Sequence, residues 1–288
     1  RAGDLKDRAL VERKLREHYQ LTLGELSVWE VAAETKPYKE LIDNFGKFIE
    51  HYVNLYMEFA AKVQVIPEAA FLSTLRRQPV VFEGAQGAML DQHQGTFPNC
   101  TRSTTTPKNA LTLLKDAVFD GQVTRHGLFR AYGTRHGAGP FPTEDEKLFV
   151  PQCDNGTGEW QGVFRTGWFD TVLARTALGF SEVDEVVLTN LDRLDGISKL
   201  KVATNYQRLD SSFYHHDKRV LVPVKDYEES ANRTKALFEA KPVYETMLGF
   251  IGKSDVNHET YIRFIEDQIQ QKITALSRRK DHHKVYRI

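Results

Sequence analysis

The run Val-Val-Phe-Glu-Gly-Ala-Gln-Gly at residues 80–87 constrains the fold of this chain more than any other stretch. Two β-branched residues and a phenylalanine predict a short buried strand, and the two glycines predict the sharp turn that ends it. Glycine lets the backbone approach a ligand closely, and Glu83 and Gln86 add polar groups to the same turn. Open α/β sheets bind ligands beyond the carboxyl ends of parallel strands, so this turn is a candidate site. The alternative is a tight turn that binds nothing.

Strands alternate with helices along the rest of the chain. Apolar periodicity and capping residues predict helices at 9–19, from Pro37 to about 65, at 107–118, at 169–178 with Gly179 as its stop, and from Asn257. Further strands are predicted at 128–132, 185–188, 199–203, 219–224 and 285–288. The alternation predicts an α/β fold with a mostly parallel central sheet and helices on both faces. We expect one domain, with a helical segment at 1–78 and the sheet and a ligand site at 79–288.

The helix expected from Pro37 carries one continuous apolar stripe. Its members recur at spacings of three and four residues and are Leu41, Phe45, Phe48, Tyr52, Leu55 and Phe59. Such a stripe is typical of a helix that faces the core. A helix that binds a partner or a membrane surface is the alternative.

The overall composition excludes several classes of protein. Lys and Arg together number 39, and so do Asp and Glu, so no net field attracts nucleic acid or an anionic membrane. No apolar run approaches the roughly 20 residues that a membrane-spanning helix needs. Cys100 and Cys153 have no repeated spacing that would indicate a disulfide framework or a zinc site, and no metal ligands are predicted. We therefore expect a cytoplasmic protein that binds neither nucleic acid nor membranes.

Five segments, in this order, carry a resemblance to a known family. They are 82–101, with its Glu-Gly-Ala-Gln-Gly and Gly-Thr-Phe-Pro runs, then 134–144, 165–170, 187–196 and 242–247. In each of them the chain resembles adenylosuccinate synthetase. The resemblance covers nearly all of the chain but only the later two-thirds or so of the family's usual length. It implies the synthetase fold, which is similar to that of P-loop NTPases.

The resemblance implies a ligase that acts in two steps: GTP phosphorylates the 6-oxygen of IMP, and the amino group of aspartate then displaces the phosphate. Mg²⁺ is the implied cofactor, GTP the co-substrate and a homodimer the assembly. In the family, an N-terminal Gly-Asp-Glu-Gly-Lys-Gly-Lys loop holds the phosphates and magnesium and supplies a catalytic aspartate, and a catalytic histidine follows. This sequence has no such loop. The catalytic pair is therefore expected upstream of this chain, in a preceding segment or on another polypeptide.

The same resemblance assigns residues to the nucleotide substrate. Gln86 is implied to contact the purine nucleotide and support catalysis, and Thr101 to bind the 5′-phosphate of IMP through its hydroxyl and backbone donors. His136 and Gly137 are implied to lie near the ribose. His136 stands where the family usually has valine, so this contact differs from the family's.

The amino-acid site departs further from the family. Thr157 and Arg165 are the expected contacts, but Val163 and Phe164 stand where the family has arginines that bind the carboxylates of aspartate. Either the amine donor differs from aspartate, or Thr157 and an arginine elsewhere bind it.

The resemblance also implies a site for the base of the nucleoside triphosphate, formed by Asn190, Asp192, Ser277 and Arg279. The family reads guanine with Lys-x-Asp, and this chain has Asn190-Leu191-Asp192, so the aspartate is retained and the lysine is not. Two arginines also replace a small Thr-Gly pair near residue 278. GTP is favoured because Asp192 is present, and ATP is the alternative.

Two hypotheses for function follow. The first is an adenylosuccinate-synthetase-like carbon–nitrogen ligase that acts in purine nucleotide biosynthesis or a specialised pathway. The second is a purine-nucleotide-binding module that has lost catalysis, which the absence of the phosphate loop favours. Neither the amine donor nor the pathway follows from the motifs.

Overall fold

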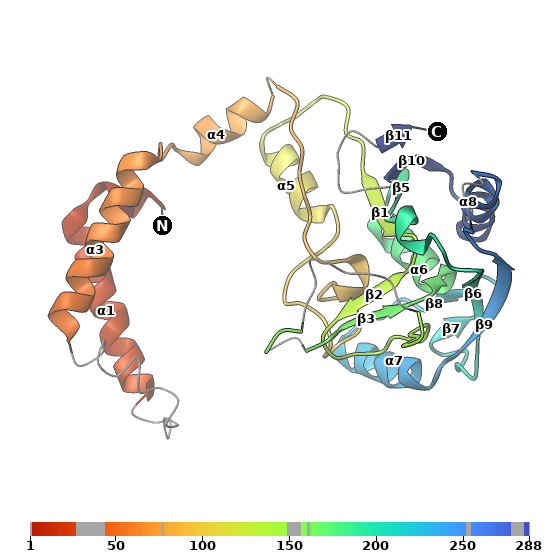
Figure 1. Cartoon of the computed structure of the whole chain (residues 1–288). Coiled ribbons are helices and arrows are strands. Elements are labelled where there is room, and N and C mark those ends of the chain that lie inside the picture. Colours follow the sequence, from red (N-terminus) through yellow and green to blue (C-terminus); the bar gives the residue numbers. More distant parts are fainter. Residues whose placement is uncertain are drawn as a thin grey trace. The chain divides into compact units, whose positions relative to one another are not determined.

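The computed structural model describes residues 2–26, 44–76, 78–148, 157–159, 162–251, 255–277 and 285–287. Contacts between residues divide the chain into two units (Figure 1). Unit 1 comprises Arg1–Val80 and Leu114–Phe119, and unit 2 comprises Val81–Leu113 and Asp120–Ile288. The division falls close to the expected limit between 1–78 and 79–288. That the whole chain forms a single domain stays a prediction.

Unit 1 is helical. Its elements are η1 (Ala2–Lys6), α1 (Arg8–Leu26), α3 (Phe45–Lys62) and α4 (Glu68–Leu75). α1 packs against α3 around the buried side chains of Val11, Ile49 and Val53, and the rings of Tyr19 and Phe45 lie 4.2 Å apart. Because apolar residues of α3 recur every three or four positions, one side of the helix is buried and the rest is exposed.

The apolar stripe predicted for this helix is buried only in its first half. Phe45 and Phe48 pack against the core of unit 1, but Leu55 and Phe59 are 50% and 54% exposed. The prediction of one continuous core-facing stripe is therefore wrong for the second half of the stripe. There α3 buries Val53, which does not belong to the stripe. Leu41 lies outside the described residues.

Unit 2 is built on a sheet with the strand order β1 (His126–Arg130), β5 (Glu185–Thr189), β10 (Ile273–Ser277) and β11 (Val285–Arg287). The first three strands are parallel, and β11 is antiparallel to β10. In β5, Val186 and Leu188 are fully buried, as expected for the central position between two strands. The predicted α/β class and parallel sheet are confirmed.

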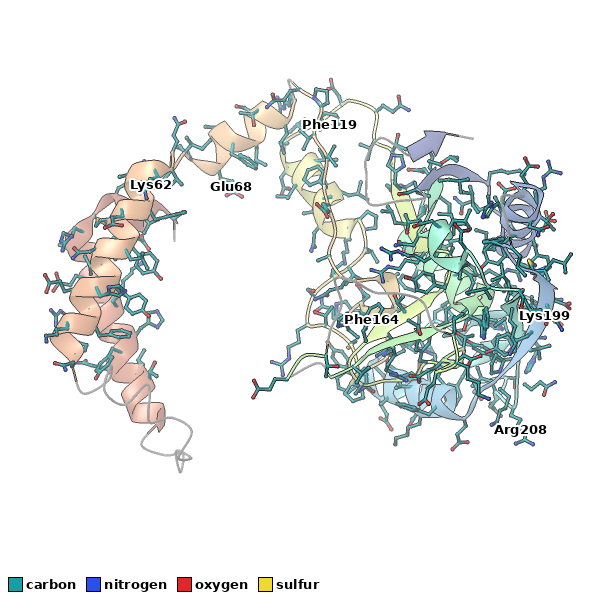
Figure 2. The ribbon with its side chains drawn as sticks, in the orientation of Figure 1. Lys62, Glu68, Phe119, Phe164, Lys199 and Arg208 are labelled. Carbon is teal, nitrogen blue, oxygen red and sulfur yellow. The ribbon has the colours of Figure 1, made fainter. Side chains whose placement is uncertain are left out.

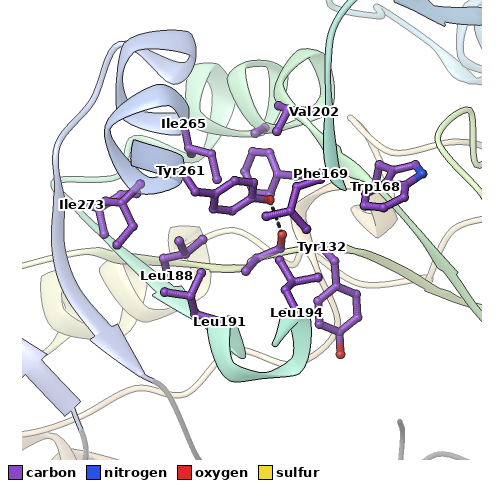
Figure 3. Packing of buried hydrophobic residues seen from close by; sticks show 14 of the residues in the cluster. Tyr132, Trp168, Phe169, Leu188, Leu191, Leu194, Val202, Tyr261, Ile265 and Ile273 are labelled. Carbon is purple, nitrogen blue, oxygen red and sulfur yellow. Dashed lines mark hydrogen bonds between the residues drawn. The ribbon is translucent and has the colours of Figure 1, made fainter. Parts of the chain in front are cut away.

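The core of this sheet is formed by aromatic and branched side chains, several of them on α6 (Thr171–Ser181), α8 (Asp255–Ile269) and η4 (Leu191–Leu194) (Figure 3). Tyr261 of α8 is buried among them, and its hydroxyl donates a hydrogen bond of 2.6 Å to the carbonyl of Ala131 (Figure 3). A buried tyrosine needs such a partner for its hydroxyl. The bond fixes the chain directly after β1, where one of the candidate site loops begins.

A second sheet has the order β4 (Phe169–Asp170), β6 (Lys199–Gln207) and β9 (Lys241–Leu248). Two hairpins pair β2 (Gly133–His136) with β3 (Phe164–Gly167), and β7 (Tyr214–His215) with β8 (Val220–Leu221). The remaining elements are η3 (Ala88–Leu90), α5 (Lys108–Asp116) and α7 (Tyr227–Glu239). Among the helices that the structure describes, none is both long and apolar enough to span a membrane.

Three predicted elements are wrong or misplaced. Residues 80–82 form no strand, and they are exposed where the sequence predicts burial. The helix expected to stop at Gly179 continues to Ser181 and ends at Glu182, which takes the left-handed conformation (φ 50°) usually left to glycine. The strand expected at 219–224 shortens to β8, because Arg219 has a positive φ of 53° that a strand does not accommodate.

Asp170 connects the second sheet to α6. It is the N-cap of α6, and its Oδ1 accepts hydrogen bonds from the backbone N–H groups of Val172 and Leu173, both at 3.1 Å. Its Oδ2 accepts a hydrogen bond from the buried hydroxyl of Tyr206. Burial disfavours the ionised carboxyl more than these bonds favour it, so the pKa of Asp170 rises from 3.8 to about 6.

The substitution Asp170→Asn is predicted to remove a pH dependence of stability. The folded chain retains a proton on Asp170 that the unfolded chain loses above pH 3.8. The contribution of Asp170 to the free energy of unfolding is therefore largest below that pH and falls as the pH rises through about 6. The full loss is about 3 kcal/mol. Asparagine keeps the capping oxygen, so the free energy of unfolding of the variant should exceed that of the wild type at pH 7.5 but not at pH 4.

Urea unfolding at a series of pH values measures this difference. Asp226→Asn is the matched control, because Asp226 caps α7 in the same manner but is exposed. If the free energies of wild type and Asp170→Asn run parallel from pH 4 to 7.5, Asp170 does not titrate in this range.

Candidate functional site

The loop at residues 87–105 is organised around the buried carboxylate of Asp91. Its Oδ1 accepts hydrogen bonds from the backbone N–H groups of His93 (2.8 Å) and Gln94 (3.0 Å), and its Oδ2 accepts one from Thr105 (2.9 Å). Gly95 lies so close that a Cβ atom there would stand 2.3 Å from the carbonyl oxygen of Asp91. The Asp91 side chain thus fixes the start and the end of the loop. The close approach of residue 95 to the Asp91 carbonyl requires glycine at that position.

Thr101, expected to bind a phosphate, lies half-buried in this loop. Its backbone N–H already donates to the carbonyl of Leu90 at 2.9 Å, and its hydroxyl lies 3.3 Å from that of Ser103. The hydroxyls of Thr101 and Ser103 are therefore the donors available to a ligand, rather than the Thr101 amide. Gln86, at the other end of the loop, is exposed and has a positive φ of 70°.

Two side chains of α7 hold the middle of the loop. The hydroxyl of Ser230 donates to the carbonyl of Gly95 at 2.9 Å and accepts from the N–H of Phe97 at 3.2 Å. Arg233 donates to the carbonyls of Gln94 (2.7 Å) and Gly95 (3.0 Å). Arg233 is only 1% exposed, and its burial lowers the pKa of the guanidinium to about 10, so it stays cationic at neutral pH.

Arg135 of β2 joins this loop to the second candidate loop, residues 134–139. Its Nη2 donates to the carbonyls of Asn99 (2.8 Å) and Ala138 (2.9 Å), and burial lowers its pKa. Gly139 has a φ of +124°, and a Cβ atom there would stand 2.0 Å from Arg135 Nη2. The loop expected to carry Thr101 and the loop expected to carry His136 are therefore held against each other by one guanidinium.

Arg165 of β3 has each of its three side-chain nitrogens engaged within the chain. Nε donates to Glu144 at 2.7 Å, Nη2 donates to the other oxygen of that carboxylate at 2.5 Å, and Nη1 donates to the carbonyls of Gly139 (2.9 Å) and Gly137 (3.2 Å). Its expected contact with the amino acid stays a prediction. What the geometry provides is a bidentate ion pair that supports the loop at 137–144.

The other face of the same hairpin carries a different set of side chains. His136 and Phe164 are opposite each other in the antiparallel pair, with ring centroids 4.5 Å apart, and the guanidinium of Arg130 lies 5.8 Å from the Phe164 ring. Phe164 is labelled in Figure 2. Aromatic rings with one cation above them suit a flat or partly apolar group better than a dicarboxylate.

The residues expected to bind a nucleotide base lie at the carboxyl edge of the main sheet. Ser277 ends β10 in register with Thr189, the last residue of β5. Asn190 follows with a positive φ of 60°, and Asp192 is in η4 directly after it. The structure therefore brings Asn190, Asp192 and Ser277 to one edge, beside the end of β1. Arg279 lies outside the described residues, and Thr157 is exposed next to the bridge between 158 and 162.

Asp91, Arg135 and Arg233 shape the site, and the sequence analysis assigned none of them a role. The helix that carries Arg233 was also missed. A signal existed: Asp226 and Glu229 have the spacing of a capping box. The Asp226 carboxylate accepts from the Glu229 N–H at 2.8 Å, and the Glu229 carboxylate accepts from the N–H of Lys225, the residue before the N-cap, at 2.9 Å.

The described residues do not fit a magnesium site. They contain no cluster of three or more His, Cys, Asp or Glu side chains that could hold a metal ion. Asp91, the carboxylate at the centre of the site loop, has its oxygens engaged by backbone N–H groups.

Comparison with known proteins places these features in a family. A family model described as adenylosuccinate synthetase matches residues 1–286. The adenylosuccinate synthetase of Aliivibrio fischeri is 31% identical over 266 residues, which cover 87% of this chain and 54% of that protein. The one of Pseudomonas paraeruginosa is 30% identical over 291 residues, which cover 93% and 62%.

A solved structure, the fully ligated adenylosuccinate synthetase from Plasmodium falciparum, is similar with a TM-score of 0.74 at 20% identity. The similarity covers 99% of this chain and 65% of that one, and it shows the shared fold. This chain thus spans between about half and two-thirds of the length of the proteins it matches.

The substitution Arg135→Met is predicted to loosen both loops. It removes the donors for the carbonyls of Asn99 and Ala138, and a hydrogen bond from a charged donor contributes about 1.5–3 kcal/mol, less where the carbonyl is exposed, as at Ala138. We expect a lower midpoint of thermal unfolding and faster amide hydrogen exchange at 96–101 and 137–139. Arg263→Met, at an exposed arginine of α8 that belongs to neither loop, is the control. Equal losses in both variants would contradict a special role of Arg135.

Proposed function

Because the chain belongs to the adenylosuccinate synthetase family, we propose that it forms the purine-nucleotide site of a carbon–nitrogen ligase. The reaction joins an amino acid, aspartate or a variant of it, to C6 of IMP. GTP is the energy donor, 6-phosphoryl-IMP the intermediate, and purine nucleotide biosynthesis or a related specialised pathway the context. The family match across residues 1–286 carries the proposal. A cytoplasmic homodimer is part of it.

In this proposal, IMP binds along the two joined loops. The paired hydroxyls of Thr101 and Ser103 donate to its 5′-phosphate, and Arg135 holds the backbone that presents them. Gln86 contacts the purine, and His136 and Gly137 flank the ribose. The geometry supports this arrangement because the Thr101 loop and the 134–139 loop are tied together, so one ligand can touch both.

The base of GTP is proposed to lie at the carboxyl edge of the main sheet. A carboxylate there can accept hydrogen bonds from the ring N–H and the neighbouring amino group of guanine. Adenine does not present this pair of donors side by side. Asp192 of η4 supplies that carboxylate, Asn190 precedes it directly after β5, and Ser277 ends the neighbouring strand β10. This favours GTP over ATP.

This chain orients substrates rather than supplying all of the chemistry. The sequence contains no phosphate-binding Gly-Asp-Glu-Gly-Lys-Gly-Lys loop, and the described residues do not fit a magnesium site. The groups that transfer the phosphoryl group and the proton are therefore proposed to come from a segment that residues 1–288 do not include.

A second candidate function is a purine-nucleotide-binding module without catalysis. The observation that favours it is the same missing phosphate loop, together with the loss of arginines at Val163 and Phe164. Release of phosphate distinguishes the two functions.

A phosphate-release assay with IMP, GTP, Mg²⁺ and a panel of amino acids, run on protein that includes the segment supplying the catalytic groups, tests the ligase and its amine donor. Val163 and Phe164 stand where carboxylate-binding arginines are expected, so we expect a high KM for aspartate. Phe164→Arg restores one guanidinium and should lower that KM by about tenfold or more. Leu113→Arg, at an exposed leucine of α5, is the control. If IMP binds but no amino acid elicits phosphate release, the binding module is favoured.

The substitution Thr101→Val is predicted to weaken IMP binding by about 10- to 100-fold, because it removes a hydrogen bond to a charged phosphate at nearly constant volume. Calorimetric titration with IMP measures the loss. Thr112→Val removes an exposed hydroxyl on α5 and should bind like the wild type. Unchanged affinity for Thr101→Val would exclude this residue from the phosphate site.

A further inference from the structure

Two aromatic rings and one cation lie together on a face of the hairpin of β2 and β3. His136 and Phe164 are opposite each other in the hairpin, and their ring centroids lie 4.5 Å apart in an edge-on arrangement. The guanidinium of Arg130 lies 5.8 Å from the centre of the Phe164 ring and donates a hydrogen bond to the hydroxyl of Thr134. We call the surface formed by Arg130, Thr134, His136 and Phe164 the Arg130 face. It combines one positive charge with aromatic rings.

Arg130 has donors to offer to a ligand. It is the exposed last residue of β1, at the carboxyl edge of the main sheet. Its one side-chain hydrogen bond within the described part of the chain is the bond from Nη1 to Thr134, at 3.3 Å, and no described carboxylate forms an ion pair with it. A guanidinium carries five N–H donors in a planar fork that matches a carboxylate. Most of the donors of Arg130 are therefore available.

The other two arginines of the hairpin are already engaged. Arg135 and Arg165 are opposite each other, one position away from the pair of rings. Arg135 donates to the carbonyls of Asn99 and Ala138, and Arg165 holds Glu144 and two backbone carbonyls. A carboxylate that binds at this hairpin therefore meets one available guanidinium, that of Arg130.

The Arg130 face coincides with the place proposed for the amine donor. Val163 and Phe164 stand where the family has arginines for the carboxylates of aspartate, and His136 is proposed to flank the ribose of IMP. A donor bound against Phe164 and His136 would therefore lie beside the bound nucleotide, as a ligase that joins the two requires.

The composition of this face does not match two carboxylates. One carboxylate of aspartate could pair with Arg130, but the second would lie against the ring of Phe164. The face of an aromatic ring carries negative partial charge, so it repels an anion. An aromatic side chain packs edge-on or offset against such a ring instead and removes apolar surface from water.

We infer that the amine donor is an α-amino acid with one carboxylate and an aromatic side chain. Arg130 binds the carboxylate, and the rings of Phe164 and His136 pack against the side chain. The inference rests on the proposed ligase function, and it names the class of amino acid that this ligase joins to IMP.

Binding of small probes to the full chain tests the inference. Saturation-transfer NMR measures the dissociation constants of L-phenylalanine, L-aspartate and phenethylamine, each with and without saturating IMP. Phenethylamine has the ring and the amine but no carboxylate. We expect L-phenylalanine to bind about tenfold or more tightly than either of the other two, because it alone fills both the cationic and the aromatic part of the face.

Two variants separate the two parts of the face. Arg130→Met should weaken L-phenylalanine by about tenfold or more and leave phenethylamine unchanged, whereas a misfolded variant would lose both. Phe164→Arg should reverse the preference, so that L-aspartate binds more tightly than L-phenylalanine. Arg263→Met and Phe238→Arg are the matched controls, at exposed residues of α8 and α7, and should bind like the wild type.

Several results would overturn the inference. They are tighter binding of L-aspartate than of L-phenylalanine to the wild type, no binding of L-phenylalanine, and equal losses of L-phenylalanine and phenethylamine in Arg130→Met. Phosphate release that depends on L-aspartate and not on L-phenylalanine would overturn it too, while leaving the ligase proposal intact. If L-phenylalanine binds as expected but no amino acid elicits phosphate release, the ligase proposal fails and the donor site stands.

Discussion

Buried guanidinium groups that bind backbone carbonyls hold the candidate site together. Arg233 and Arg135 donate to the carbonyls of Gln94, Gly95 and Asn99. Neither arginine forms an ion pair among the described contacts, so backbone carbonyls, with the Thr96 hydroxyl at Arg135, offset the cost of removing the charge from water. This cost is visible in the lowered pKa of both side chains, with that of Arg233 at about 10.

The consequence is that the site loop depends on elements far from it in the sequence. Arg233 and Ser230 project from α7, whose Leu237 packs in the same buried cluster as Tyr206 and Tyr214. Arg135 lies on the hairpin of β2 and β3, which Arg165 and Glu144 brace from the same side. Packing of α7 and of this hairpin therefore sets the positions of the hydroxyls that a ligand would meet.

The loop at 87–105 and the turn that precedes it differ in how many hydrogen bonds hold them. The loop at 87–105 is densely bonded around Asp91, whereas the turn with Gln86 that precedes it is exposed and makes few contacts. A loop with internal hydrogen bonds keeps its shape without a neighbour, but an extended segment keeps its shape only when another strand pairs with it. The half of the site that is proposed to bind the purine nucleotide is thus largely formed within this chain, and residues 80–82 before it are exposed.

Much of the fold could be predicted from the sequence. The alternation of strands and helices indicated the parallel sheet, because the period of apolar residues is a local property of a sequence. The motifs identified the family and the loops that carry Thr101 and His136. Gly95 and Gly139 are turn residues of these loops. Glycine is required at both positions because a Cβ atom there would collide with nearby atoms.

The tertiary structure decided the rest. Residues 80–82 have a strand-forming sequence yet form no strand, because a strand requires a partner that local sequence does not specify. The contact of Arg165 with the amino acid stays a prediction, and only the fold shows that the Glu144 carboxylate and backbone carbonyls lie within reach of its nitrogens. Sequence by itself determined which residues form each loop; only long-range contacts determined which of their donors are left for a ligand.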